Sequence, residues 1–152
     1  MTGEGYCKWY GVKCAGKNDY FKTEGNGNVF SIELTANSLI GTIPPEIALL
    51  TDLYNLEMNS NWIQSTIPTE FGLLTNLHDL YLEDNELEGS IPKELANSKE
   101  LRQISLASNS IDGTLPKEIG YISELRKLNL KETGLYGQLP DTLHLLRHLG
   151  KS

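Results

Sequence analysis

The chain has 152 residues, 39% of them hydrophobic and 22% charged, and its formal net charge is −7. This length and composition fit one folded domain in water. The acidic balance argues against a nucleic-acid partner, because phosphate backbones are bound by an excess of Lys and Arg, and no apolar run approaches the roughly 18 to 20 residues of a membrane-spanning helix.

Residues 1–28 are predicted to form an amino-terminal cap. Met1–Tyr6 lack the basic and apolar regions of a signal peptide, so we expect a mature chain or a segment of a longer one. Cys7 and Cys14 predict a disulfide, which would stabilise the fold by about 2 to 3 kcal/mol and indicates an oxidising compartment. The alternative is half of a zinc site or a redox pair, for which Cys-x-x-Cys spacing or more ligands would be expected.

Residues 29–148 consist of one unit repeated five times. Five prolines fall 24 residues apart, at Pro44, Pro68, Pro92, Pro116 and Pro140. The units share the pattern L-x-x-L-x-L-x-x-N-x-L-x-G-x-I-P and open at Val29, Leu53, Leu77, Leu101 and Leu125. A repeat of this length predicts a solenoid, in which stacked neighbours bury a continuous core.

Each unit opens with a short predicted strand. In Leu101-x-x-Ile104-x-Leu106, the residues at 104 and 106 are expected to point inward, and the variable residues between them outward. Five such strands stacked in parallel at about 4.8 Å would form a concave ribbon. We therefore predict an α/β repeat fold, a right-handed solenoid with short parallel strands on the concave face and 3-10 or irregular helical segments on the convex face.

Two further columns of residues are expected to shape the turns. Asparagines recur at Asn37, Asn61, Asn85 and Asn109, with Thr133 in the fifth unit, and their amides are expected to satisfy buried backbone groups. Glycines recur before each Ile-Pro or Leu-Pro step and permit a backbone bend. Ser65 replaces the glycine of the second unit, so we expect a slightly altered bend there.

The exposed positions of the ribbon supply the candidate ligand-binding residues. They are acidic and aromatic in the first three units and basic in the last two. The candidates are Glu33, Tyr54, Glu57, Trp62, Asp79, Tyr81, Glu83, Arg102 and Lys127. Exposed aromatics are enriched in interface hot spots, and Glu33 and Glu57 share a column where a basic partner would relieve their repulsion. The alternatives are solvated carboxylates and aromatic rings that pack between neighbouring strands.

We expect no catalytic residue, cofactor or metal ion. Glu57, Asp79, Glu83 and Asp84 cluster, but an open ribbon neither buries a carboxylate nor excludes water. A calcium site at residues 83–86 is disfavoured because Asn85 belongs to the structural column, and His144 and His148 lack a third ligand.

The sequence Asn85-Glu86-Leu87-Glu88-Gly89-Ser90-Ile91-Pro92 resembles the plant-specific class of leucine-rich repeats. Residues 7–14, Cys-x-Trp-x-Gly-Val-x-Cys, resemble the amino-terminal cap of that class, and together the two resemblances cover residues 7–148. The class includes the ectodomains of receptor-like kinases and receptor-like proteins, inhibitors of cell-wall polygalacturonases and a few ice-binding proteins. The resemblance implies non-catalytic recognition of a protein or peptide, in the secretory pathway, at the cell surface or outside the cell.

These expectations define the hypothesis. Residues 1–28 form the cap, residues 29–148 the five repeats, and residues 149–152 the start of a sixth unit. The repeats bind a protein or peptide ligand through the concave face, as the ligand-binding part of a receptor-like protein. The alternatives are a structural subunit of a larger complex and an inhibitor of a cell-wall hydrolase.

Overall fold

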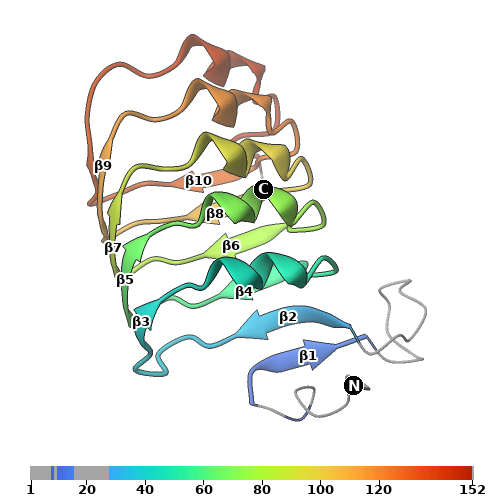
Figure 1. The fold of residues 1–152 in the computed structure, drawn as a ribbon. Helices are drawn as coiled ribbons and strands as arrows, with labels where there is room; N and C mark the ends of the chain where they lie inside the picture. The colour runs from blue at the N-terminus through green and yellow to red at the C-terminus, as the bar shows by residue number, and fades with distance from the viewer. Residues whose placement is uncertain (1–7, 9, 16–27, 152) are drawn as a thin grey trace.

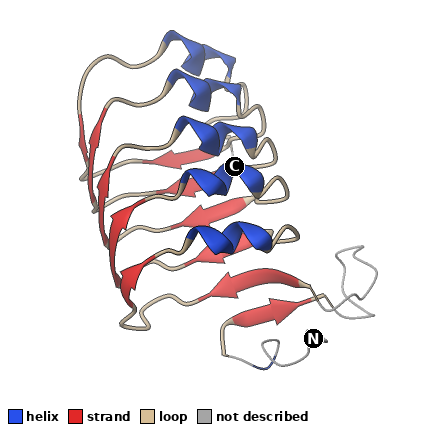
Figure 2. Ribbon diagram, in the orientation of Figure 1, coloured by secondary structure: helices blue, strands red, loops and turns tan. Residues whose placement is uncertain are grey.

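The computed structural model describes residues 8, 10–15 and 28–151. From residue 29 onward, each turn of the chain passes through a strand of a first sheet, a strand of a second sheet and a 3-10 helix before it reaches the next level (Figure 1). The two sheets and the column of helices form separate faces (Figure 2). The prediction of a solenoid with short parallel strands and 3-10 segments is confirmed.

The first sheet has the order β1-β2-β4-β6-β8-β10. Its strands are β1 (Val12–Cys14), β2 (Val29–Glu33), β4 (Asn55–Glu57), β6 (Asp79–Tyr81), β8 (Gln103–Ser105) and β10 (Lys127–Asn129). The strands from β2 to β10 are parallel, and Leu56, Leu80 and Ile104 pair in one inward column that is almost completely buried. Because successive side chains of a strand point to opposite faces, the residues on either side of this column face outward.

A second sheet, which the sequence analysis did not anticipate, follows the first in every turn. Its order is β11-β9-β7-β5-β3. Its strands are β3 (Ile40–Thr42), β5 (Trp62–Thr66), β7 (Glu86–Gly89), β9 (Ser110–Gly113) and β11 (Gly134–Leu135). Ile63, Leu87 and Ile111 point inward and are buried, while their neighbours are exposed or partly exposed. The second sheet therefore presents a lateral face of its own.

The bend at the end of each second-sheet strand has a positive φ angle. Gly41, Gly89, Gly113 and Gly137 adopt φ values from 70° to 109°, which an L-residue rarely adopts. Ser65 adopts φ 73°. The expected alteration of the bend at Ser65 is therefore wrong. The neighbouring strands hold Ser65 at a positive φ angle like that of the glycines in the other units.

The prolines of the repeat start the 3-10 helices. Pro44, Pro68, Pro92, Pro116 and Pro140 are the extended N-cap residues, with φ between −60° and −72°. The helices are η2 (Pro45–Leu49), η3 (Thr69–Leu73), η4 (Lys93–Asn97), η5 (Lys117–Tyr121) and η6 (Asp141–Leu145). Phe71, Leu95 and Ile119 extend from this column into the core. The helices approach closely, since a Cβ atom on Gly72 would lie 2.3 Å from the Glu94 carbonyl oxygen of the next helix.

Three asparagines connect consecutive turns through the core. Asn85 Nδ2 donates to the carbonyl oxygens of Met58, Leu82 and Glu83 at 3.0 to 3.3 Å, and its Oδ1 accepts from Ile63 N at 3.0 Å. Asn61 and Asn109 make equivalent sets of bonds. Exposed Asn37 reaches only the Thr35 carbonyl, at 3.5 Å, and the Thr133 hydroxyl donates to the Leu130 carbonyl at 2.9 Å.

The amino-terminal strand β1 runs antiparallel to β2 and lies beside the first parallel strand. Gly11 has φ 80°, and a Cβ atom there would lie 2.2 Å from the Glu33 carbonyl oxygen, so this position requires glycine. The predicted disulfide of Cys14 involves Cys7, which lies outside the described residues, and it stays a prediction.

Candidate ligand-binding face

The first sheet presents two outward columns of side chains, here called the ribbon columns. One column contains Ser31, Asn55, Asp79, Gln103 and Lys127, and the other contains Glu33, Glu57, Tyr81, Ser105 and Asn129. The two serines of these columns are buried, and the neighbouring Asn55 and Asn129 amides donate to their hydroxyl groups. Five of the predicted residues therefore lie on the ribbon columns of one sheet. Tyr54 and Arg102 immediately precede β4 and β8, and Glu83 lies two residues beyond β6, so these three border the same face.

Trp62 is placed differently. It belongs to β5 of the second sheet and is 58% exposed, beside a shallow hollow that includes Ser60, Asp84 and Glu86. The second sheet was not predicted, and the tenth position of the unit was therefore assigned to the ribbon. Trp62 is a candidate for the lateral face, not for the ribbon columns.

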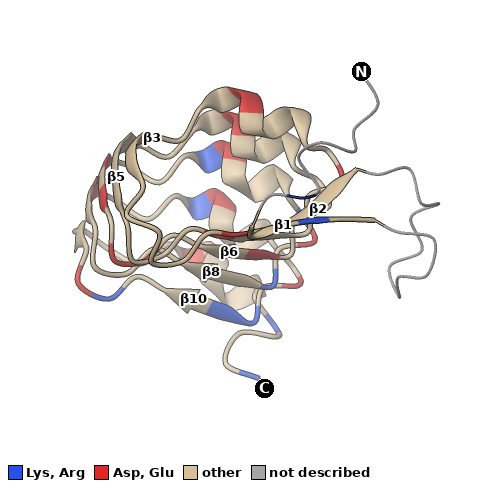
Figure 3. Ribbon diagram, turned by 90° about the horizontal axis from the view of Figure 1, so that it is seen from below, with Lys and Arg blue, Asp and Glu red and all other residues tan. Residues whose placement is uncertain are grey.

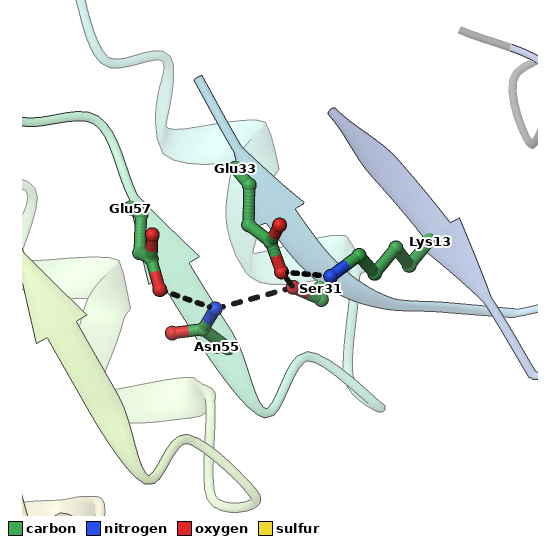
Figure 4. A network of polar contacts seen from close by, with 5 residues as sticks. All are labelled: Lys13, Ser31, Glu33, Asn55 and Glu57. Carbon is green, nitrogen blue, oxygen red and sulfur yellow. Dashed lines mark hydrogen bonds and ion pairs between the residues drawn. The ribbon is translucent and has the colours of Figure 1, made fainter. Parts of the chain in front are cut away.

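A polar network joins the acidic end of the ribbon to the cap (Figure 4). Lys13 of β1 forms an ion pair with Glu33, and the Ser31 hydroxyl donates to the same carboxylate oxygen at 3.0 Å. The Asn55 amide donates to Glu57 Oε1 at 3.0 Å and to the Ser31 hydroxyl at 3.2 Å. The hydrogen bond from Lys13 lowers the pKa of Glu33, against the opposing effect of burial.

This network changes how the paired carboxylates are interpreted. Glu33 and Glu57 do lie in register on neighbouring strands. Each, however, accepts a hydrogen bond from within the chain, and Glu33 also has a cation beside it. The sequence analysis did not single out Lys13, because the antiparallel pairing that places it beside Glu33 is not encoded in the repeat.

The centre of the face combines a half-buried carboxyl group with a phenol. Burial raises the pKa of Asp79 above its ordinary value, and a hydrogen bond from Gln103 opposes this rise. Burial also raises the pKa of Tyr81, with further contributions from the charges of Asp79, Glu57 and Glu83. The Tyr81 phenol therefore stays protonated at neutral pH and retains an O–H donor. Glu83 Oε2 is buried and has no hydrogen-bond partner.

Tyr54 and His78 occupy equivalent positions on neighbouring levels. Their rings are stacked, with centroids 4.0 Å apart and planes inclined by 21°. His78 Nδ1 lies 2.8 Å from the Asn76 carbonyl oxygen, within hydrogen-bond distance. Tyr54 thus packs laterally between strands, which was the alternative to a purely ligand-binding role.

The carboxyl-terminal half of the face is basic. Lys and Arg residues gather at β10 and at the carboxyl-terminal end of the chain (Figure 3). Arg102, Arg126, Lys127 and Lys151 border a hollow of about 570 Å³, which Tyr54 and Asp79 also line. The predicted charge gradient along the ribbon is therefore present in the structure.

Among residues 8, 10–15 and 28–151, no group of three or more His, Cys, Asp and Glu side chains is arranged to hold a metal ion. None of the helices in this part of the chain is long and apolar enough to cross a membrane.

Comparisons with known proteins identify the repeat. The model of the Leucine Rich Repeat family matches residues 76–98 and 100–122. A chain of the BIR3–SERK2 complex from Arabidopsis thaliana is 31% identical, with a TM-score of 0.79 over 90% of this chain and 70% of that chain. A comparison with curated proteins found no match.

Two further solved structures extend the likeness. The ectodomain of the Arabidopsis thaliana receptor kinase GASSHO1/SCHENGEN3, solved in complex with CASPARIAN STRIP INTEGRITY FACTOR 2, is 32% identical, with a TM-score of 0.88 over 96% of this chain but only 17% of that one. The ectodomain of the Arabidopsis thaliana receptor kinase SOBIR1 is 26% identical, with a TM-score of 0.84 over 95% of this chain and 78% of that chain. The chain belongs to the leucine-rich-repeat family, in the plant-type class that contains these receptor-kinase ectodomains.

Proposed function

We propose that the chain is a non-catalytic recognition module that binds a protein or peptide ligand through the first sheet, as the extracellular ligand-binding part of a receptor-like protein. One observation carries this proposal. The ribbon columns present carboxylates, amides, a phenol and a lysine from a hydrogen-bonded sheet, and no element of residues 8, 10–15 and 28–151 packs over them. A face that is ordered before binding loses little conformational entropy when a ligand docks.

The solved relatives support the same proposal. The structures that resemble this chain include a receptor bound to CASPARIAN STRIP INTEGRITY FACTOR 2, the plant peptide hormone receptor RGFR1 bound to RGF2, and HAESA bound to a peptide hormone ligand. The chain spans only 17% to 27% of these three receptor chains, so their ligands are not transferred to it. What supports the proposal is the repeated association of this fold with protein and peptide ligands.

The test compares variants of the two sheets. The chain and the variants Glu57→Ala/Tyr81→Ala and Trp62→Ala are used as baits against secreted proteins of the source, and retained proteins are quantified by mass spectrometry. We expect the first-sheet variant to lose the specific partner, since Tyr81 is at the centre of the face and aromatic anchors dominate interface energetics. The second-sheet variant should retain it.

The outcomes separate the two faces. Loss with Trp62→Ala alone would move the site to the second sheet, and equal retention by all three baits would contradict recognition through either candidate. Circular dichroism of each variant must show the parental melting temperature, because a loss of binding that follows unfolding carries no information about the surface.

A structural subunit of a larger complex is a second candidate, favoured by a specific observation. Ile40, Leu49 and Leu139 have between 77% and 80% of their surface exposed, and Tyr136 has 68% exposed. Ile40 belongs to β3, Leu49 to η2, and Tyr136 and Leu139 follow β11, so a partner that covers these side chains would contact more than one face of the solenoid. Sedimentation velocity of the purified chain with its recovered partner distinguishes a stable stoichiometric complex from reversible ligand binding.

A further inference from the structure

The hollow at the carboxyl-terminal half of the first sheet, here called the basic hollow, is built by residues far apart in sequence. Arg102 and Arg126 lie at the same position of consecutive levels, and Lys127 follows on β10. Gly150 N donates to the Arg126 carbonyl at 2.8 Å, and this bond holds Lys151 at the far wall. The volume of about 570 Å³ lies in the range of pockets that hold small ligands or several side chains.

The charge of the basic hollow is opposite to that of the chain. Four cations and one carboxylate, Asp79, line it, so its formal charge is 4 − 1 = +3 in a chain of −7. The ion pairs within the described residues involve Lys13, His78 and Lys131, and none of these four cations takes part in them. Asp79 interacts electrostatically with Arg102, but as the single carboxylate in the lining it leaves a surplus of positive charge in the hollow.

Two features of the arginines favour an anion as the ligand of the basic hollow. Arg102 Nε is buried and has no hydrogen-bond partner, and a buried donor without a partner is destabilising. In addition, Arg126 N donates to the Arg102 carbonyl at 2.8 Å, so the backbones of the two arginines are neighbours on adjacent levels, and both side chains border the basic hollow. Like charges on neighbouring strands repel each other, and an anion between them would reverse this effect.

We propose that the basic hollow binds a short acidic segment of the peptide or protein ligand, with side-chain carboxylates between Arg102, Arg126 and Lys151. The planar guanidinium group matches a carboxylate through two parallel hydrogen bonds, which favours this group over a spherical anion. The inference rests on the proposed function and specifies the charge of the ligand at one end of the face.

The rest of the ribbon argues for a segment whose charge is localised. Asp79 of β6 already lines the hollow, and the next outward carboxylates along the ribbon are Glu57 of β4 and Glu33 of β2. A long polyanion, such as an acidic polysaccharide, would meet these carboxylates if it continued along the ribbon. A peptide with its acidic residues over β8 and β10, and neutral hydrogen-bonding residues over β4 and β6, avoids that repulsion.

The experiment observes the arginine side chains directly. The full chain, labelled with ¹⁵N-arginine, is titrated at constant ionic strength with a short acetylated and amidated peptide of Gly and Ser that contains two adjacent aspartates. The matched peptide contains asparagines instead. We expect the Arg102 Nε–H resonance to shift and saturate with the aspartate peptide only. Arg102→Gln and Arg126→Gln should each weaken binding by about tenfold, and Lys117→Gln on η5 by less than about twofold.

Each other outcome overturns the proposal. If the asparagine peptide shifts the Arg102 Nε–H resonance as much as the aspartate peptide does, carboxylate recognition is excluded. If Lys117→Gln weakens binding of the aspartate peptide as much as the arginine variants do, the binding is a non-specific attraction between charges. Tighter binding of inorganic phosphate, or of an acidic oligosaccharide, than of the aspartate peptide would assign the hollow to that anion. If the natural partner is retained by Arg102→Gln/Arg126→Gln but lost with Glu57→Ala/Tyr81→Ala, the basic hollow is wrong while the proposed function stands. Retention by both variants contradicts both.

Discussion

The asparagines that recur in the repeat allow a buried, fully bonded position to be compared with an exposed position that makes one weak contact. Asn85→Ala removes the amide group of a side chain that is 9% exposed. The Nδ2 atom that is lost donates to three carbonyl oxygens, and the Oδ1 atom accepts from one backbone N–H. At about 1 kcal/mol net for each of these four hydrogen bonds, and with the freed backbone groups still buried, we expect a loss of about 3 to 4 kcal/mol. For a chain of this length, that corresponds to a decrease in Tm of roughly 10 °C.

The matched control is Asn37→Ala, in the same column of the repeat. Asn37 is exposed, and its side chain makes a single 3.5 Å contact with the Thr35 carbonyl, so its removal should cost less than about 0.5 kcal/mol. Urea unfolding, followed by circular dichroism, measures both variants against the parent. Similar losses for Asn85→Ala and Asn37→Ala would refute the argument, because the effect would then come from asparagine itself and not from its buried bonds.

Three further perturbations test the backbone and the cap. Ser65→Gly should raise the free energy of unfolding by about 0.5 to 1 kcal/mol, because φ 73° is strained for serine; an unchanged urea midpoint would contradict that strain. Gly72→Ala should lower the free energy of unfolding by at least about 2 kcal/mol, because the new Cβ would lie 2.3 Å from the Glu94 carbonyl oxygen. A parental Tm for this variant would show instead that η3 and η4 can move apart. The lowered pKa of Glu33 means that its contribution is present at neutral pH and lost as the pH falls through that lowered value. Lys13→Ala should therefore reduce stability by less than about 1 kcal/mol at neutral pH, and this loss should shrink as acid protonates Glu33, as chemical denaturation across a series of pH values would show.

The parts of the fold that depend on periodicity could be predicted from the sequence. The sequence alone shows the step of 24 residues and predicts an inward column at Leu56, Leu80 and Ile104. The structure pairs these three residues, and the predicted solenoid is confirmed. The second sheet could not be recognised, because its strands are short and end at a glycine and an Ile-Pro step that indicate a turn. The alternation of Trp62, Ile63 and Gln64 was the available signal.

The site was predictable only where it lies on the repeat. Glu57, Asp79 and Tyr81 were assigned to one face from their positions in the unit, and the structure places them on the ribbon columns. The partner of Glu33 could not be found in this way, because Lys13 belongs to a segment outside the repeat and reaches the sheet through an antiparallel pairing. Whether these residues bind a ligand stays a prediction.

The opposite direction of β1 has a consequence for how this array could have lengthened. All other pairings of the two sheets are parallel and repeat the same register, so a duplicated 24-residue segment inserted after β2 would find the same hydrogen-bond partners on both sides. Beyond β1, the spacing of donors and acceptors is that of an antiparallel edge, which a further unit of this kind does not match. A duplicated unit is therefore compatible with the first sheet only on the β2 side of β1, so the array can lengthen in one direction from this strand.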